Sequence, residues 1–285
     1  MVREKLTILE VISKSSQYLK KKGIKRYKTD AEWLVAFALK CKRMDLYLRF
    51  GEVLGDDVLD VIKNLVIERG KRIPLQHILG EVHFAGLTLK CDRRALVPRF
   101  ETEFLVDYLY NQLSSAFSGK IADLGCGSGA ISLSLGALLP NAQVWGFDKS
   151  APALELANEN LSFSKLQGQV FFEEFDWLAS SSLSDSYDLI VCNPPYLTEQ
   201  EWQETEPEVQ LHDPKEALIS QKNGLSDLAH VVRIASKSLD KNGLLALEFG
   251  LNQADMVEQL LIQSFDVEII KDQYLVRRFA YATKR

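Results

Sequence analysis

The chain has 285 residues, of which 46% are hydrophobic and 26% are charged, and its formal net charge is −5. This composition is that of a globular protein, long enough for one large domain or two modest ones. The acidic balance argues against a protein that lives on long DNA or RNA, which would usually carry a basic surface. The first residues are charged and periodic, and no apolar run approaches the ~18 residues of a membrane span. We therefore expect a cytoplasmic protein.

The cysteines and histidines indicate neither disulfides nor a metal site. The four cysteines are scattered without C-x-x-C spacing, so we expect free thiols in a reducing compartment. The four histidines show no metal-ligand spacing, so no metal is expected.

Residues 1–72 are predicted to form helices. Apolar residues recur at helical spacing in LTILEVISKSSQYLK and in DDVLDVIKNLVIERGK. Between them, TDAEWLVAFALK places Glu32 three residues after Thr29, which predicts a helix that begins with a capping box. Residues 73–95 alternate in short runs around Gly80 and Gly86, which predicts a β-hairpin linker.

The remaining residues, 96–285, show an alternation of strands and helices. The helix of VPRFETEFLVDYLYNQL comes first, and from residue 119 short apolar strands alternate with amphipathic helices. Ser150 is the expected N-cap of the helix that follows the strand AQVWGFD. This rhythm predicts a doubly wound parallel α/β sheet, and the end, DVEIIKDQYLVRRFAYATK, reads as a closing hairpin within or beside it.

A glycine-rich loop, IADLGCGSGA, follows the first of these strands and opens a helix. Glycines at 125, 127 and 129 permit a tight turn and close approach of a ligand to the backbone. The acidic residue that ends the next strand, Asp148, is placed to accept both hydroxyls of a ribose. The loop alone fits NAD or S-adenosylmethionine. Asp123 favours the second, because a carboxylate would repel a pyrophosphate and attract the ammonium group of a methionine tail.

The stretch Asn193-Pro194-Pro195-Tyr196 ends the strand YDLIVC, at the sheet edge where open α/β sheets bind ligands. The prolines stiffen an extended backbone, so the Asn193 side chain and the Pro194 carbonyl present two acceptors for one planar –NH2 group. Tyr196 offers a flat face for stacking. This pattern predicts an amino-group methyltransferase that acts mainly by positioning. The substrate group stays open at this point among glutamine, adenine, cytosine and guanine.

Two charged stretches permit more than one interpretation. The basic run KKKGIKRYK could contact a partner, although such runs are more often solvated loops. The acidic stretch TEQEWQETEPEVQ follows the four residues 193–196, which we call the clamp. It could complement a basic patch of a substrate or could be solvated. Cys126 and Cys192 lie near the predicted site, and with no basic group to activate a thiolate both are expected to be small filler residues.

Nearly the whole chain resembles the HemK/PrmC family of protein-glutamine methyltransferases. The resemblance rests on DAEWLVAFAL, PLQHILGEVHFAGL, VPRFETE, DLGCGSG and NPPY. It implies methylation of the glutamine in the Gly-Gly-Gln motif of bacterial class I peptide chain release factors. The alternative is a nucleic-acid methyltransferase acting on an exocyclic amine such as adenine N6, because the glycine loop and NPPY are shared with such enzymes. A non-catalytic adaptor and an NAD oxidoreductase are weaker rivals.

The resemblance further implies an α/β, Rossmann-like class I fold that uses S-adenosyl-L-methionine, releases S-adenosyl-L-homocysteine and has a seven-stranded, mostly parallel sheet. The domains would be a helical substrate-recognition domain at 1–72, a hairpin linker at 73–95 and a catalytic domain at 96–285. We expect a monomer that binds release factors and neither a membrane nor nucleic acid.

The resemblance also assigns roles to single residues. The glycine loop would hold the methionine part of the cofactor, Asp148 the ribose, and Asp176 with Trp177 the adenine. The residues expected at the cofactor are Asp123, Gly125, Cys126, Gly127, Ser128, Gly129, Asp148, Asp176, Trp177 and Asn193. Those expected at the substrate are Phe100, Thr102, Asn193, Pro194, Pro195 and Tyr196, with Asn193, Pro194 and Tyr196 as the catalytic group. The chain departs from the family at several positions, among them Phe100 in place of proline and QKNG without the usual double glycine.

Overall fold

A computed structural model describes residues 5–285, which divide into two units, each described here by itself. The first unit contains the described residues up to Gly80 and the segment Glu206–His212. The second contains Glu81–Thr205 and Asp213–Arg285. The chain therefore leaves the second unit after Thr205 and returns to it at Asp213. No helix in the described part of the chain is long and apolar enough to cross a membrane.

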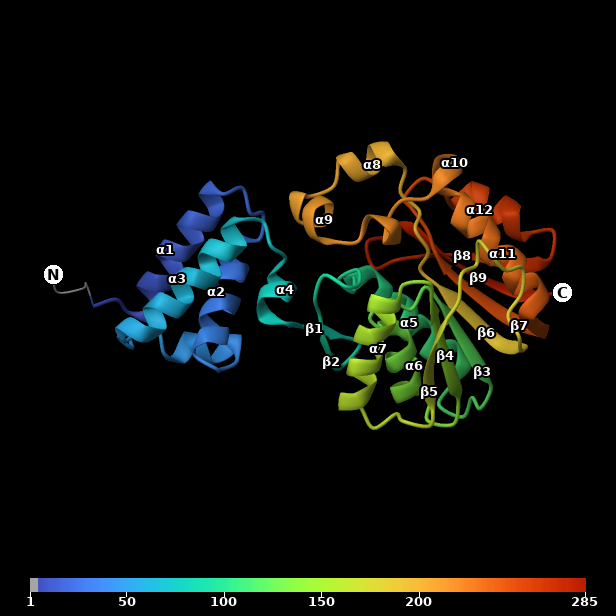
Figure 1. Cartoon of the computed structure of the whole chain (residues 1–285), viewed down its shortest axis with the longest axis horizontal. Helices are drawn as coiled ribbons and strands as arrows, with labels where there is room; N and C mark the ends of the chain where they lie inside the picture. Colours follow the sequence, from blue (N-terminus) through green and yellow to red (C-terminus); the bar gives the residue numbers. More distant parts are fainter. Residues whose placement is uncertain (1–4) are drawn as a thin grey trace. The chain divides into compact units, whose positions relative to one another are not determined.

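The first unit is helical, as predicted (Figure 1). Its core gathers the apolar faces of the helices, with Ile8, Leu19, Leu34, Leu46 and Ile62 almost or wholly inaccessible to solvent. The elements are α1 (Ile8–Lys21), α2 (Tyr27–Ala38), the 3-10 helix η1 (Arg43–Leu48), α3 (Asp56–Gly70), α4 (Leu75–Leu79) and α9 (Pro207–His212).

The capping box predicted at Thr29 is wrong. Helix α2 already begins at Tyr27, so Thr29 lies inside its first turn, and the N-cap residue Arg26 makes no side-chain cap bond. A capping box does occur at α1, where the Thr7 side chain accepts from Glu10 N–H and the Glu10 carboxylate accepts from Thr7 N–H. The Thr-x-x-Glu spacing misled at α2, because Thr29 and Glu32 both lie within the helix, where the backbone N–H groups beyond the first turn already have partners.

Arginines of the first unit bind the acidic segment 206–212. Arg69, at the end of α3, is buried and donates to Asp30 and to Glu208, each at 2.7 Å. Arg72 pairs with Glu208 at 2.6 Å, and Lys25 pairs with Glu206. Two glutamates of the acidic stretch are therefore paired within the first unit, Glu208 with little exposure and Glu206 in a largely exposed pair with Lys25 of the basic run.

The second unit opens with the predicted hairpin, β1 (Glu81–Phe84) paired antiparallel with β2 (Leu87–Lys90). The short helix α4 before it was not predicted. Pro74 at its N-cap and Gly80 in the left-handed conformation at its C-cap are helix-end signals, and both look like turn residues in the sequence.

The large sheet of the second unit has seven strands in the order β5-β4-β3-β6-β7-β9-β8, which confirms the predicted class I methyltransferase fold (Figure 1). The pairs from β5 to β7 are parallel. The closing hairpin is antiparallel and inserts the last strand between β7 and β8. The strands are β3 (Lys120–Leu124), β4 (Gln143–Asp148), β5 (Val170–Glu174), β6 (Tyr187–Cys192), β7 (Leu239–Glu248), β8 (Phe265–Lys271) and β9 (Arg277–Lys284).

Helices pack on both faces of this sheet. Successive strand residues point to opposite faces, so Ile121 and Leu189 lie in the cluster that includes α5 and α6, and Ala122 and Ile190 lie in the cluster of α11 and α12. The helices are α5 (Phe100–Leu113), α6 (Ala130–Leu138), α7 (Ala151–Phe163), α8 (Glu199–Gln203), the 3-10 helix η2 (Lys215–Ala217), α10 (Gln221–Gly224), α11 (Ser226–Ser238) and α12 (Ala254–Leu261). Ser150 caps α7, as predicted, by accepting from Ala153 N–H.

Candidate active site

The register of the parallel strands gathers the candidate residues at one edge of the sheet. Leu124 of β3 lies beside Cys192 of β6, and Cys192 lies beside Leu247 of β7. The next residue of each strand or loop is Gly125, Asn193 or Glu248. Gly125 and Asn193 were predicted as site residues and Glu248 was not, although an acidic residue at the end of the apolar run LLALE was a usable signal.

The glycine loop is shaped by three left-handed residues. Gly125, Gly127 and Gly129 have φ of 74°, 56° and 79°, a backbone conformation that residues other than glycine rarely adopt. A Cβ at Gly125 would also lie 3.0 Å from the ring of Trp177. At Gly127 the nearest atom to an added Cβ would be Ala95 Cβ at 3.8 Å, so there is room beside the loop. The loop fits a ligand that approaches the backbone at Gly127.

The backbone of the loop is held by β4. Gly125 N–H and Cys126 N–H both donate to the Phe147 carbonyl, at 2.7 and 3.0 Å. The Asp148 carboxylate accepts from Gly127 N–H and from Ser150 N–H, each at 2.9 Å. Burial raises the pKa of Asp148, while these backbone bonds act to lower it. Each carboxylate oxygen keeps further lone pairs, so a ribose role for Asp148 stays a prediction.

Asp123, the last but one residue of strand β3 before the loop, is fully buried. Its Oδ2 accepts from Ser132 N–H at 3.0 Å and from the Ser132 hydroxyl at 2.6 Å, whereas Oδ1 has no partner within residues 5–285. Burial raises the pKa of Asp123 to about 7. The carboxyl thus links β3 to the start of α6, and its predicted attraction for an ammonium group stays a prediction.

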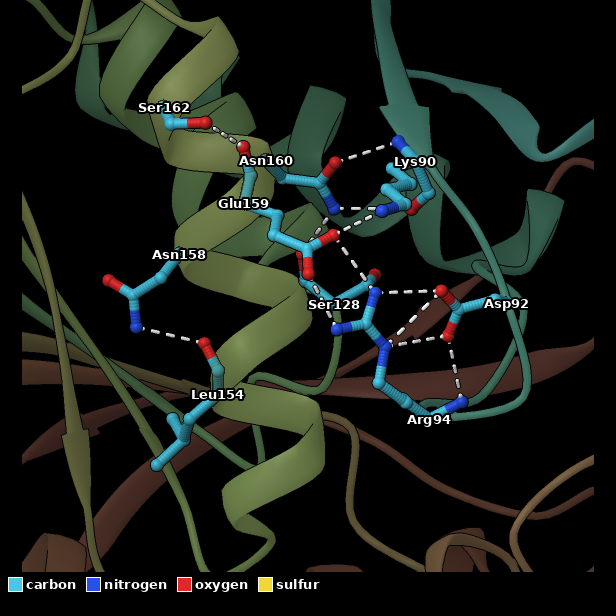
Figure 2. A network of polar contacts seen from close by, with 9 residues as sticks. All are labelled: Lys90, Asp92, Arg94, Ser128, Leu154, Asn158, Glu159, Asn160 and Ser162. Carbon is cyan, nitrogen blue, oxygen red and sulfur yellow. Dashed lines mark hydrogen bonds and ion pairs between the residues drawn. The ribbon is translucent and has the colours of Figure 1, made fainter.

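The side chain of Asn160 in α7 also binds the backbone of the glycine loop (Figure 2). Its side chain donates to the Ser128 carbonyl at 3.0 Å and to the Lys90 carbonyl at 3.2 Å, and it accepts from Lys90 N–H at 2.7 Å. One buried amide therefore joins helix α7, strand β2 and the loop. This contact was not predicted, because nothing in the local sequence shows which polar residue of a helix is buried.

Ion pairs surround this amide (Figure 2). Arg94 donates to the carboxylates of Asp92 and Glu159, and Lys90 also pairs with Glu159. Arg94 and then Lys90 lower the pKa of Glu159 to about 2. These exposed or half-exposed pairs add little stability each, and together they orient the hairpin against α7.

The two residues predicted at the adenine lie directly after β5. Trp177 is buried, and its indole N–H donates to Asp227 at 2.8 Å, which fixes the ring whose edge approaches Gly125. Asp176 is half-exposed and accepts from Leu178 N–H at 2.8 Å. Trp177 therefore lies beside the glycine loop, and Asp176 is its neighbour in the sequence.

The clamp residues lie beyond the end of β6. Pro194 and Pro195 are buried, while Asn193 and Tyr196 are half-exposed. Asn193 Nδ2 donates to Thr102 Oγ1 at 3.1 Å, and Tyr196 OH donates to Glu248 Oε1 at 3.2 Å. Within residues 5–285, neither Asn193 Oδ1 nor the Pro194 carbonyl accepts a hydrogen bond. Two acceptors therefore remain for a ligand.

The other two predicted substrate residues lie in the first turn of α5, and only one of them contacts the clamp. Thr102 is buried behind Asn193 and donates its hydroxyl hydrogen to Glu248 Oε2 at 2.7 Å. Phe100 is 61% exposed, an unusual exposure for a phenylalanine. The structure thus separates the two, with Thr102 supporting the clamp and Phe100 on the surface.

Cys126 and Cys192 are buried free thiols, as predicted. Burial is the main cause that raises the pKa of each well above its ordinary value, so neither is a thiolate at neutral pH.

The strand order, the glycine loop and the edge site together define a class I methyltransferase. A solved methyltransferase from Pyrococcus furiosus shares this fold, with a TM-score of 0.52 and 16% identity over 76% of this chain and 98% of that one. Two family models match, "Methyltransferase small domain" at residues 100–225 and "PrmC N-terminal domain" at residues 10–80.

Curated relatives extend the similarity over most of the chain. The "Release factor glutamine methyltransferase" of Deinococcus radiodurans is 34% identical over 98% of this chain and 99% of its own length. The protein of the same name from Fusobacterium nucleatum subsp. nucleatum is 35% identical over 89% of this chain and 72% of its own. This chain belongs to the release factor glutamine methyltransferase family, which confirms the resemblance drawn from the sequence.

Proposed function

We propose that this protein transfers a methyl group from S-adenosyl-L-methionine to the side-chain amide nitrogen of the Gly-Gly-Gln glutamine of class I peptide chain release factors. The observation that carries the proposal is the clamp: two unoccupied acceptors, Asn193 Oδ1 and the Pro194 carbonyl, in a chain whose relatives are named for this reaction. The family relationship favours this function over nucleic-acid amine methylation, since the clamp alone fits both.

The residues present fit the cofactor. Gly127 leaves room at the loop, Asp148 has unused lone pairs, and Trp177 presents a fixed ring. We assign the cofactor-binding role to these residues with Asp123, Gly125, Cys126, Ser128, Gly129 and Asp176. When bound, S-adenosyl-L-methionine supplies a methyl group on a positively charged sulfur, and S-adenosyl-L-homocysteine leaves.

The side chains of the clamp would act by positioning. Asn193 Oδ1 and the Pro194 carbonyl accept the two amide hydrogens, so the nitrogen lone pair, weak because it is delocalised, points out of that plane toward the methyl group. The N–C bond would form as the bond between sulfur and the methyl group breaks, and the nitrogen would lose one of these hydrogens as a proton to water. Burial and then the neighbouring Glu248 raise the pKa of Tyr196, so Tyr196 stays a neutral phenol and its ring packs on the substrate instead of accepting the proton.

The domain roles and the setting are part of the proposal. Residues 1–72 would recognise the release factor, and Phe100 would border the substrate glutamine. The exposed aromatic ring of Phe100 supports the second assignment. We expect a cytoplasmic monomer that binds release factor without nucleic acid.

The test uses tritiated-methyl S-adenosylmethionine with a purified release factor, either unchanged or with the Gly-Gly-Gln glutamine replaced by alanine. Label on the unchanged factor alone supports the proposal. Label on total RNA or DNA, with none on either factor, overturns it in favour of the nucleic-acid alternative.

A second experiment tests the clamp. We expect Asn193→Ala to lower kcat at least about 100-fold while the Kd for S-adenosylmethionine, measured by calorimetry, changes less than about tenfold. Near-normal turnover would refute the clamp.

A further inference from the structure

A continuous chain of hydrogen bonds joins both sides of the clamp through Glu248. Asn193 Nδ2 donates to Thr102 Oγ1, the Thr102 hydroxyl donates to Glu248 Oε2, and Tyr196 OH donates to Glu248 Oε1. The three distances are 3.1, 2.7 and 3.2 Å. A carboxylate at the end of β7 thus contacts the residue behind Asn193 and the tyrosine after the prolines.

The direction of these bonds sets the orientation of the Asn193 amide. A threonine hydroxyl has one hydrogen and two lone pairs, and an ionised carboxylate can only accept. With its hydrogen bound to Glu248, Thr102 can offer only a lone pair to Asn193. The group of Asn193 that meets a lone pair must be the –NH2 group, so Oδ1 is turned to the open side, where a substrate amide needs an acceptor.

Glu248 is 1% exposed, and the groups around its carboxyl both favour and oppose its ionised form. The groups that face it are Thr102 and Glu101 of α5, Tyr196, and Arg278 of β9, whose own carboxylate partner is Asp272 at 3.1 Å. Burial is the largest influence and raises the pKa of Glu248 to about 7, while Thr102, Arg278 and Tyr196 oppose it.

We propose that Glu248 is a positioning residue for methyl transfer: its carboxylate, acting through Thr102, keeps the Asn193 amide oxygen toward the substrate. This inference rests on the proposed function and adds a residue to it. When Glu248 gains a proton, the Thr102 hydrogen is released and can donate to Asn193 Oδ1. The amide can then turn, and its –NH2 group would face the substrate –NH2 group, donor against donor. The clamp is therefore formed by the ionised network and weakened by its protonation.

The kinetic test compares Glu248→Gln and Thr102→Val with the unchanged enzyme. We expect kcat to fall about 10- to 100-fold in each, with the Kd for S-adenosylmethionine within about threefold. The double variant should lose little more than either single one, because both changes break the same chain. Thr102→Ser keeps the hydroxyl and should retain more kcat than Thr102→Val.

The pH profile separates positioning from mere packing. In the unchanged enzyme kcat should rise as pH increases through about 7, and this limb should vanish in Glu248→Gln. The matched control is Asp188→Asn at the amino end of β6, and it should keep the limb. Within residues 5–285 the Asp188 carboxylate accepts only from Lys120 N–H, at 2.8 Å. A Glu248→Gln enzyme with unchanged kcat and an unchanged profile overturns the proposal and leaves the proposed function standing.

A spectroscopic readout needs no substrate. In protein labelled with ¹⁵N-asparagine, the side-chain –NH2 signals of Asn193, assigned with Asn193→Ala, should titrate near neutral pH and should not titrate in Glu248→Gln. If they titrate identically in both, the coupling is wrong. If they behave as expected but no release factor is methylated, the network stands as a property of the site and the proposed function fails instead.

Discussion

Replacing Asn160 by leucine should loosen the glycine loop. The substitution keeps the size of the side chain and removes its bonds to Ser128 and to both backbone groups of Lys90 (Figure 2). At about 1 kcal/mol for each of these bonds, the free energy of unfolding should fall by about 3 kcal/mol. For a unit of this size that corresponds to a Tm lower by roughly 6–12 °C. Because Ser128 belongs to the loop, the Kd for S-adenosylmethionine should also rise, by about tenfold.

The assay pairs urea denaturation with calorimetric titration of the cofactor, and the control is two residues away on the same helix. Asn158 is exposed, and its side chain donates only to the Leu154 carbonyl of its own helix, at 2.8 Å. Asn158→Leu should change the free energy of unfolding by less than about 0.5 kcal/mol. Equal losses in the two variants would refute the reasoning, since the buried position of Asn160 would then contribute nothing.

Three further predictions concern the backbone and the buried acid. Lys222→Gly should raise the free energy of unfolding by about 1 kcal/mol in urea denaturation, because Lys222 has φ of 53°, which favours glycine. A variant no more stable than the unchanged protein would show that the backbone at Lys222 is not strained. Gly224→Ala should lower Tm and raise KM for the release factor, because its Cβ would lie 2.1 Å from the Tyr196 carbonyl; unchanged kinetics would show that the clamp tolerates the shift. The raised pKa of Asp123, about 7, means that this carboxyl contributes stability below its unfolded pKa of about 4 that is lost as pH rises through about 7. Between about pH 4 and pH 7 the free energy of unfolding of Asp123→Asn should therefore rise relative to that of the unchanged protein by about 4 kcal/mol, because about three pKa units correspond to about 1.4 kcal/mol each. Parallel curves of stability against pH for the two proteins would refute this.

The sequence predicted the elements that carry strong periodicity and the site residues that stand in contiguous motifs. The helices α1 and α3, the strand–helix alternation and the closing hairpin all follow from local patterns, whereas the position of β9 between β7 and β8 was left open. Gly125 and Asn193 were found because each belongs to a short string whose chemistry is complete in itself.

The parts that the sequence did not predict depend on contacts between distant residues. Glu248 and Thr102 are 146 positions apart and meet because α5 packs against the sheet at β7. Asn160 looks like any polar residue of an amphipathic helix until the fold buries it. The N-cap predicted at Thr29 was wrong although the local pattern was that of a capping box, because helix α2 begins at Tyr27, two residues before Thr29.

The return of Glu206–His212 to the helical unit makes that unit discontinuous along the chain. A protein truncated at Gly80 would keep the contact of Arg69 with Asp30 but lose its contact with Glu208, and Arg72 would lose its contacts with Glu206 and Glu208. Exchange of the helical unit between members of the family would require two separate segments of the gene, because the seven residues Glu206–His212, which follow the clamp in the sequence, belong to that unit. Substitutions in the two pieces are therefore expected to co-vary, and the catalytic half cannot diverge freely between Thr205 and Asp213 while the helical half stays fixed.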